Sequence, residues 1–256
     1  RTETVGLAKS VERDYESNSV SATNVWFFNG KNTELTLGAS YTYDTINPAN
    51  KIVVDEHKRI VELMAGATQV LTTADIVQLA LRYSDGNGYY NDPYKSMDER
   101  PRHRSGKSIL SRWNHYWDSA GSTSRISYRY YTDSFGIDAH TINLEYVQPL
   151  SHGWSLMPLL RLHTQTEARF YLPTDSAQPD LPVFPDPNAR YFSEDQRLSA
   201  FGARTVGAKL SKQISRDLLV DVKIERYEQR SAWALRGKPD EGLSPFSARS
   251  IQVGFN

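Results

Sequence analysis

The feature that most constrains this chain is a period of two in hydrophobicity that runs through almost its whole length. In residues 75–84, DIVQLALRYS, one parity is mainly hydrophobic and the other is mainly polar or small. Side chains of a β-strand point alternately to two faces, so this pattern predicts a strand with one apolar and one polar face. Residues 35–43, 126–130, 142–146 and 218–225 repeat it.

About twelve segments follow this pattern, and no segment has a convincing helical period. Strands are expected at 3–12, 17–28, 33–45, 57–70, 75–85, 107–118, 123–133, 138–148, 154–171, 198–213, 217–230 and 248–256. Many have ten or more residues, whereas strands of globular proteins most often have about 5 or 6. The sequence therefore predicts an all-β protein, an antiparallel up-and-down transmembrane β-barrel, as a single domain over residues 1–256.

The connections between these segments alternate in length. The short ones read NGKN, LTTA, SAGS, PLSHG and ISR, and the longest lie at 86–106, 172–197 and 231–247. Outer-membrane barrels have short periplasmic turns and longer extracellular loops, so the alternation favours that class and a location in the bacterial outer membrane. The alternative from another class is a soluble all-β sandwich acting as a binding module, with its charged face as the exterior.

Composition excludes several functions. The chain has 30 basic and 30 acidic residues, so it lacks the broad positive charge expected of a nucleic-acid-binding protein. It has no cysteine, which removes disulfides and thiolate metal sites. Its 15 Tyr and 5 Trp suit strands that cross a membrane interface. No apolar run approaches the roughly 18 residues of a membrane-spanning helix, and no signal peptide opens the chain.

Several segments resemble a family of Gram-negative outer-membrane β-barrel proteins known only as a domain of unknown function. The most specific are GYYNDPYKS and RYYTDSFG, supported by VVDEHKR, YFSEDQRLSAFGA and PFSARSIQVGFN. The resemblance implies a barrel of about 14–16 strands, of which this chain is roughly the C-terminal two-thirds. It implies no catalytic residue. It also suggests a periplasmic partner, because members are often encoded near flavin-attachment and redox proteins of the envelope.

The polar parity supplies candidates for the lining of a barrel lumen. These residues are Gln78, Arg82, Arg112, Arg125, Arg129, Asn143, Glu145, Arg161, Asp221, Lys223 and Glu225. One interpretation is a channel for small polar or anionic solutes, in which cationic side chains favour anions. The other is that arginines and carboxylates pair across strands and only stiffen the wall. The second also suits a structural role in an envelope system.

A second group of candidates is expected in an extracellular loop that starts near residue 86. It contains Asp85, Asn87, Asp92, Tyr94 and Lys95, whose oxygen-rich surroundings resemble a calcium loop. The EF-hand spacing fails, because Tyr89 holds the third ligand position and Ser96 the twelfth. We therefore expect an ordered turn and no metal site or other cofactor.

Further expectations concern lipid contacts, catalysis and one long loop. The expected partners are outer-membrane lipid and lipopolysaccharide, whose phosphates Arg100, Arg102 and Arg104 could contact unless they form only a solvated basic turn. We expect this protein to have no enzymatic activity. The alternative, an outer-membrane hydrolase using His140 or His163, lacks a GxSxG or HExxH motif. The proline-rich loop 172–197 is long enough to enter the lumen or to bind a ligand outside.

Overall fold

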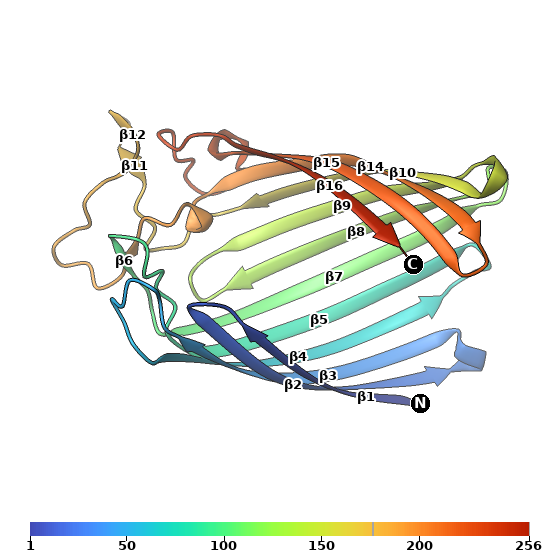
Figure 1. Ribbon diagram of the computed structural model, residues 1–256, viewed down its shortest axis with the longest axis horizontal. Coiled ribbons are helices and arrows are strands. Elements are labelled where there is room, and N and C mark those ends of the chain that lie inside the picture. The colour runs from blue at the N-terminus through green and yellow to red at the C-terminus, as the bar shows by residue number, and fades with distance from the viewer. Residues whose placement is uncertain (176, 256) are drawn as a thin grey trace.

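The computed structural model describes residues 1–175 and 177–255, and its main element is one antiparallel sheet of twelve strands (Figure 1). The strands of this sheet are β1 (Thr2–Val11), β2 (Tyr15–Phe28), β3 (Thr33–Ile46), β4 (Glu56–Val70), β5 (Asp75–Gly88), β7 (His103–Trp117), β8 (Ser122–Asp133), β9 (Asp138–Pro149), β10 (Trp154–Gln165), β14 (Phe201–Ser215), β15 (Leu218–Arg230) and β16 (Phe246–Phe255). They pair in chain order, so the up-and-down topology is confirmed.

Two small sheets lie in the connections. Strand β6 (Asp98–Glu99) pairs with β13 (Phe192–Ser193), and β11 (Thr174–Asp175) pairs with β12 (Gln178–Pro182). Helical structure in the described ranges is limited to three-residue 3-10 turns. No described helix has the length and hydrophobicity needed to cross a membrane.

The predicted strands are confirmed except at some ends, and the largest error lies at the end of β10, before the longest connection. Strand β10 ends at Gln165 instead of residue 171, and β14 begins at Phe201 instead of 198. The chain leaves the sheet because Ala168, which is 1% exposed, is buried in a cluster of loop residues. Its N–H donates to the carbonyl oxygen of Leu198 at 2.8 Å. Tertiary burial therefore ended a strand that alternation alone would have continued.

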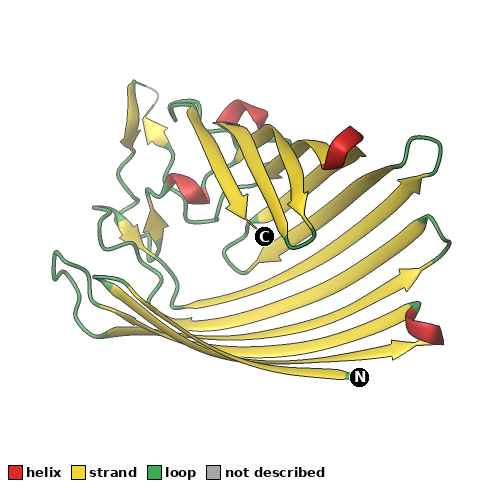
Figure 2. Ribbon diagram, turned by 45° about the vertical axis from the view of Figure 1, so that its right-hand side comes forward, coloured by secondary structure: helices red, strands yellow, loops and turns green. Residues whose placement is uncertain are grey.

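All connections longer than four residues lie at one end of the sheet, and the other end has only short turns (Figure 2). We call these the loop end and the turn end. The loop end holds residues 47–55, 89–102, 134–137, 166–200 and 231–245, with the short turn 12–14, and the turn end holds 29–32, 71–74, 118–121, 150–153 and 216–217. This separation confirms the predicted alternation of connection lengths.

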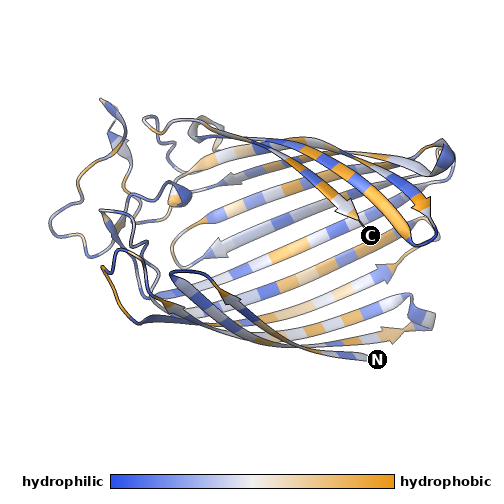
Figure 3. Cartoon of the chain, in the orientation of Figure 1, coloured by the Kyte–Doolittle hydropathy of each residue, from blue (hydrophilic) through white to orange (hydrophobic). Residues whose placement is uncertain are grey.

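The sheet has two chemically different faces, visible as alternating bands along the strands in Figure 3. The apolar face carries Leu79, which is 50% exposed, and Ile224, which is 56% exposed. The polar face carries Gln78 and Arg112, which lie directly opposite each other. Because the twelve strands form one sheet and not two packed sheets, the alternative of a soluble sandwich is wrong.

The main hydrophobic core is small and lies at the loop end. It consists of Phe135, Ile137, Ala139, Ala168 and Leu198. Tyr90, Tyr131, Phe170 and Tyr171 pack against it. The core therefore joins loops 89–102, 134–137 and 166–200 to the wall at one mouth of the curved sheet.

The two outermost strands each have one unpaired edge. Within the described residues, β1 pairs only with β2 and β16 only with β15, so the sheet does not close. The directions of β1 and β16 are opposite (Figure 1). Antiparallel closure therefore needs either direct pairing of these edges or an even number of further strands.

Gly88 is required where β5 enters the loop. Its φ of 139° is in a region that L side chains rarely adopt, and a Cβ there would lie 2.1 Å from the carbonyl oxygen of His57. We expect Gly88→Ala to lower the free energy of unfolding by about 1–3 kcal/mol, measured by urea titration of heat-modifiable gel migration. Gly66→Ala is the control, because its φ is not positive and its Cβ would lie 3.6 Å from the nearest atom, the carbonyl oxygen of Leu79. Equal urea midpoints for the two variants would contradict this account.

Candidate functional site

The candidate site lies on the polar face of β5 to β15. One row across this face consists of Gln78, Arg112, Ser127, Asn143 and Arg161, each opposite its neighbour in the pairing register. The pairing register puts all other predicted lining residues on the same face as this row, so the structure places the whole predicted set on one face. Strand pairing thus brings together residues that are up to about 80 positions apart in sequence.

Neutral amide oxygens orient two arginines of this row. The Arg112 Nη1 atom donates to Gln78 Oε1 at 3.1 Å, and the Arg161 Nε atom donates to Asn143 Oδ1 at 2.6 Å. Asn143 in turn donates from Nδ2 to Ser127 Oγ at 3.0 Å. An amide acceptor fixes a guanidinium without neutralising its charge. Both arginines therefore remain positively charged and keep free N–H groups.

Other predicted lining residues form the cross-strand pairs of the alternative interpretation. Arg125 lies 3.7 Å from Glu145, and Arg82 lies 4.0 Å from Glu62, both long for ion pairs. Lys223 lies 2.8 Å from Glu225 on the same strand. Asp221 lies on the same face of that strand, two positions before Lys223. Arg129 has no carboxylate within 4.0 Å in the described part of the chain. The face thus contains both paired residues and arginines without a compensating acid.

The uncompensated arginines line connected hollows on this face. A hollow of about 530 Å³ is bounded by Arg112, Arg129 and Arg161, with further residues from β7 to β15. An adjoining hollow of about 460 Å³ shares Arg112 and Arg161 and adds Arg125 and Glu145. One carboxylate faces four guanidinium groups in the two hollows together. The polar face is therefore concave here and strongly cationic.

A larger cavity of about 820 Å³ lies at the loop end of the same face. Tyr15 and Lys58 line it from the wall, and Tyr94 and Arg197 line it from the loops. It shares Arg129 and His163 with the first hollow. The three hollows therefore form one series along the polar face, with arginines at each junction.

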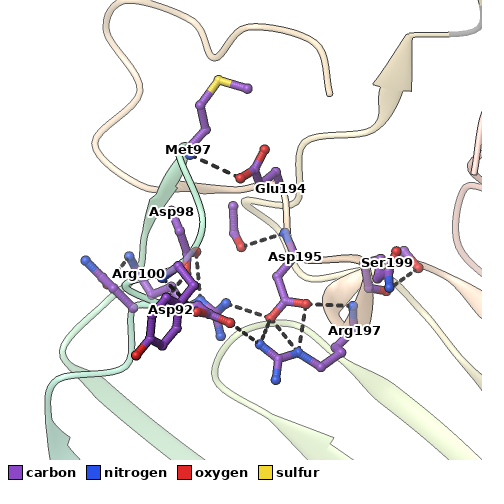
Figure 4. A network of polar contacts seen from close by, with 12 residues as sticks. Asp92, Met97, Asp98, Arg100, Glu194, Asp195, Arg197 and Ser199 are labelled. Carbon is purple, nitrogen blue, oxygen red and sulfur yellow. Dashed lines mark hydrogen bonds and ion pairs between the residues drawn. The ribbon is translucent and has the colours of Figure 1, made fainter. Parts of the chain in front are cut away.

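A network of ion pairs holds two loops together above this cavity (Figure 4). Asp195 accepts from Arg100 Nη2 at 2.7 Å and from Arg197 Nε at 2.8 Å. Arg197 also reaches Asp92 at 2.6 Å, and Arg100 also reaches Asp98 at 2.8 Å. These bonds tie loop 89–102 to the segment around 195, about 95 residues away in sequence. We call these five residues the latch.

Asp195 is the centre of the latch, because its side chain is only 2% exposed. Burial would raise the pKa of this carboxyl, but the hydrogen bonds from Arg197 and Arg100 outweigh burial and lower the pKa to about 2. The group is therefore ionised at any ordinary pH. Because the Asp195 carboxylate is buried, removing one of its arginine partners would leave a charge without solvent, so the latch is more costly to break than the exposed pairs of the wall.

The predicted extracellular loop is partly corrected. Asp85 and Asn87 belong to β5, which runs to Gly88, and they have the parity of the apolar face. The strand continues because residues 85–87 pair with both β4 and β7. Asp85 accepts from His103 at 2.9 Å. Of the glycines that suggested a loop, Gly88 allows close approach to His57 on β4, and Gly86 leaves room for the Tyr90 hydroxyl.

The other residues of that prediction do lie in loop 89–102. Asp92 belongs to the latch, and the Tyr94 hydroxyl donates to Asp14 at 2.8 Å. The Lys95 N–H donates to the carbonyl oxygen of Asp92 at 3.0 Å. No cluster of three metal-binding side chains occurs among residues 1–175 and 177–255. These contacts describe an ordered turn.

The three arginines considered for lipid phosphates are engaged within the chain. Arg100 is in the latch, Arg102 makes two hydrogen bonds to Glu56 at 2.7 and 2.8 Å, and Arg104 pairs with Asp133 at 2.5 Å. They therefore form more than a solvated basic turn, and their contact with lipid phosphates stays a prediction. Of the long loop 172–197, the C-terminal part packs against loop 89–102, whereas Phe184 is 89% exposed.

The histidines considered for hydrolysis lie on opposite faces. His163 is on the polar face, with Nδ1 2.9 Å from Thr141 Oγ1. His140 is on the apolar face, with Nδ1 2.7 Å from the Tyr128 hydroxyl. Ser134 Oγ accepts from the Ser105 N–H at 3.0 Å. The two histidines therefore cannot act together in one site.

Sequence reasoning missed the latch. Arg197 and Asp195 belong to no recognised motif, and their partners Arg100 and Asp92 lie in another loop. The only available signal was the density of opposite charges in NDPYKSMDER and SEDQR. Such a density is typical of many solvated loops.

A comparison with protein families matches residues 1–57 and 48–247 to the family described as "Protein of unknown function (DUF3570)". The chain belongs to this DUF3570 family. This confirms the resemblance found in the sequence. No curated protein matches the DUF3570 chain.

Two solved structures are similar to the DUF3570 chain. One is BamA from Haemophilus ducreyi lacking POTRA domains 1–3, at 14% identity and a TM-score of 0.45, with 98% of this chain and 61% of that chain covered. The other is the outer membrane transporter YddB from Escherichia coli, at 9% identity and a TM-score of 0.37, with 92% and 50% covered. The DUF3570 chain thus spans less than two thirds of either protein.

Proposed function

We propose that this chain forms part of the wall of a bacterial outer-membrane β-barrel that conducts small anions through a cationic lumen. The observation that carries the proposal is the set of polar-face arginines, Arg112, Arg129 and Arg161, that have no paired carboxylate. A pore lined by such groups lowers the energy of an anion more than that of a cation.

The apolar face supports the membrane part of the proposal. Leu79, Ile109 and Ile224 are about half exposed there, at 50%, 46% and 56%. A soluble protein rarely exposes so wide a hydrophobic surface without a partner. Acyl chains cover such a face in outer-membrane barrels, whose strands alternate apolar-out and polar-in.

Aromatic residues on this face are spaced as a membrane requires. Trp113 and Trp117 lie near the turn end of β7, and Tyr83 lies near the loop end of β5. Tyr83 pairs with Lys107, ten positions from Trp117. Ten residues span roughly 33 Å along a strand, or about 25 Å in height at a tilt of about 40°. This matches the apolar band of outer-membrane barrels, which aromatic girdles flank.

Closure of the sheet is part of the proposal. An unpaired strand edge is costly in hydrocarbon, because its N–H and C=O groups find no water. Further strands between β1 and β16, giving about 14–16 in total, would satisfy both edges within the range of known barrels. The latch would then lie over the extracellular mouth and narrow the entrance.

The test is single-channel recording on the full-length protein, refolded in detergent and inserted into a planar bilayer. A potassium chloride gradient gives the reversal potential. We expect chloride to be preferred over potassium by about fivefold. A fixed charge 4 Å from a passing ion in water changes the energy of that ion by about 1 kcal/mol, which corresponds to a factor of about five. Cation preference would contradict the anion proposal. A folded protein without conductance would instead support the role of a structural partner in an envelope system.

A further inference from the structure

A second cationic cluster lies on the opposite, apolar face. Arg204 on β14, Arg226 and Arg230 on β15, and Arg249 on β16 all have the parity of that face, and all lie in the loop-end half of their strands. All four are exposed to solvent. We call them the outer arginine cluster. They point away from the lumen, so the proposed conduction does not use them.

The charges of this cluster are not balanced within the described chain. Glu228 is paired with both Arg204 and Arg226, at 2.5 Å each. Arg230 and Arg249 have no carboxylate within 4.0 Å in residues 1–175 and 177–255. Arg226 and Arg249 are directly opposite in the register. Like charges in that position destabilise a sheet unless an anion lies between them.

A tryptophan completes the cluster. Arg204 and Arg230 both lie over the Trp233 ring, each with its guanidinium carbon 5.0 Å from the ring centroid. Trp233 can approach the sheet because Gly202 has no side chain, and a Cβ there would lie 2.2 Å from the Trp233 carbonyl oxygen. The ring orients these two arginines without neutralising them.

The surface next to the cluster is strongly apolar. One step along the same face, Ile224 is opposite Ile251, which is 72% exposed. Val222 and Val253 follow in the same way. Charge and hydrophobicity therefore meet about 7 Å apart, two residues along a strand. This boundary matches an amphipathic ligand with an anionic head and long acyl chains.

We propose that the outer arginine cluster binds the phosphorylated headgroup of an outer-leaflet lipid, whose acyl chains lie along Ile224 and Ile251. The inference rests on the proposed membrane location but not on conduction. Arginine suits this role because it donates two parallel hydrogen bonds to one phosphate. This site on strands β14 to β16 is separate from the lipid contact predicted from the sequence at Arg100, Arg102 and Arg104.

The test is native mass spectrometry of the full-length protein in detergent, titrated with bisphosphorylated lipid A and, separately, with the same lipid after removal of both phosphates. We expect the wild-type protein to bind the bisphosphorylated form at least about tenfold more tightly. We expect Arg226→Gln with Arg249→Gln to remove most of that difference. The matched control is Arg102→Gln with Arg216→Gln, which changes the same charge outside the cluster.

Each outcome has a definite meaning. Equal affinity of the wild-type protein for the two lipid forms would overturn the proposal, even if the double variant failed to fold. An equal loss in the control would also overturn it, because the effect would then be general charge. Competition by millimolar inorganic phosphate as strong as that by lipid A would show a phosphate site and not a lipid site. Heat-modifiable migration and conductance, measured on the same variants, report separately on the barrel and on the proposed channel.

Discussion

Replacement of Arg112 and Arg161 together with glutamine is expected to reduce the fivefold preference for chloride to below about twofold, because only Arg129 of the three uncompensated arginines remains. Each guanidinium is held by an amide oxygen, at 3.1 Å from Gln78 and 2.6 Å from Asn143, so its charge is available to a passing anion. Glutamine keeps a donor in the row but removes the charge. The measurement is the reversal potential of single channels in a potassium chloride gradient, before and after substitution.

The control for this result is Arg59→Gln with Lys107→Gln. Both residues are exposed and have the parity of the apolar face, so the net charge changes equally while the lumen is untouched. We expect the control to keep the wild-type selectivity. If both double variants shift the reversal potential by the same amount, the selectivity comes from overall charge and the polar-face arginines have no special role.

Asp195→Asn is expected to release loop 89–102 from the segment around residue 195. Removal of one partner from a buried ion pair costs on the order of 3–5 kcal/mol. The lower value applies here, because Arg100 keeps Asp98 and Arg197 keeps Asp92. Loop protection against hydrogen exchange, measured by mass spectrometry, should therefore fall roughly 100-fold, whereas strand amides should be unchanged.

Acid should reproduce this effect in the wild-type protein. The folded pKa of Asp195, about 2, lies below the usual aspartate value of about 3.9. Ionisation of Asp195 therefore stabilises the latch above about pH 4, and this contribution is lost as the pH falls from about 4 through 2. Exchange in the two loops, corrected for its intrinsic pH dependence, should rise over that interval and stay constant between pH 5 and 7.

Asp186→Asn is the control for the latch, because Asp186 is exposed in the same long loop and bonds only locally, to the Asn188 N–H at 2.8 Å. It should leave exchange in loop 89–102 at the wild-type level. If Asp195→Asn also leaves exchange in both loops unchanged, the latch does not hold them.

The sheet could be predicted from the sequence because alternation is a local property. Within one strand, the alternation of residues is enough to tell which side chains share a face, as Gln78 and Arg82 do on β5. The long polar connections mark where strands end. The errors occurred where tertiary burial competed with alternation, at residues 166–171, and where glycine suggested a loop but allowed a strand, at residues 86–88.

The candidate site could be predicted only in part. Parity assigned Arg112, Arg125 and Arg161 to one face, but it did not indicate which of them has a carboxylate partner. That distinction depends on the register between strands, which places Asn143 beside Arg161 and Glu145 beside Arg125. A shift of two residues in the pairing of β9 would have exchanged these partners, whereas a shift of one would have turned its side chains to the other face.

The sequence by itself determined the strands, their two faces and the order of long and short connections, since each follows from residues adjacent in the chain. Only the tertiary structure decided the latch, the amide-held arginines and the outer arginine cluster. Each of these joins residues from different strands or loops, such as Arg100 with Asp195 and Arg226 with Arg249. Periodicity contains no information on such distant contacts, because they are fixed by strand register and by the packing of loops against one another.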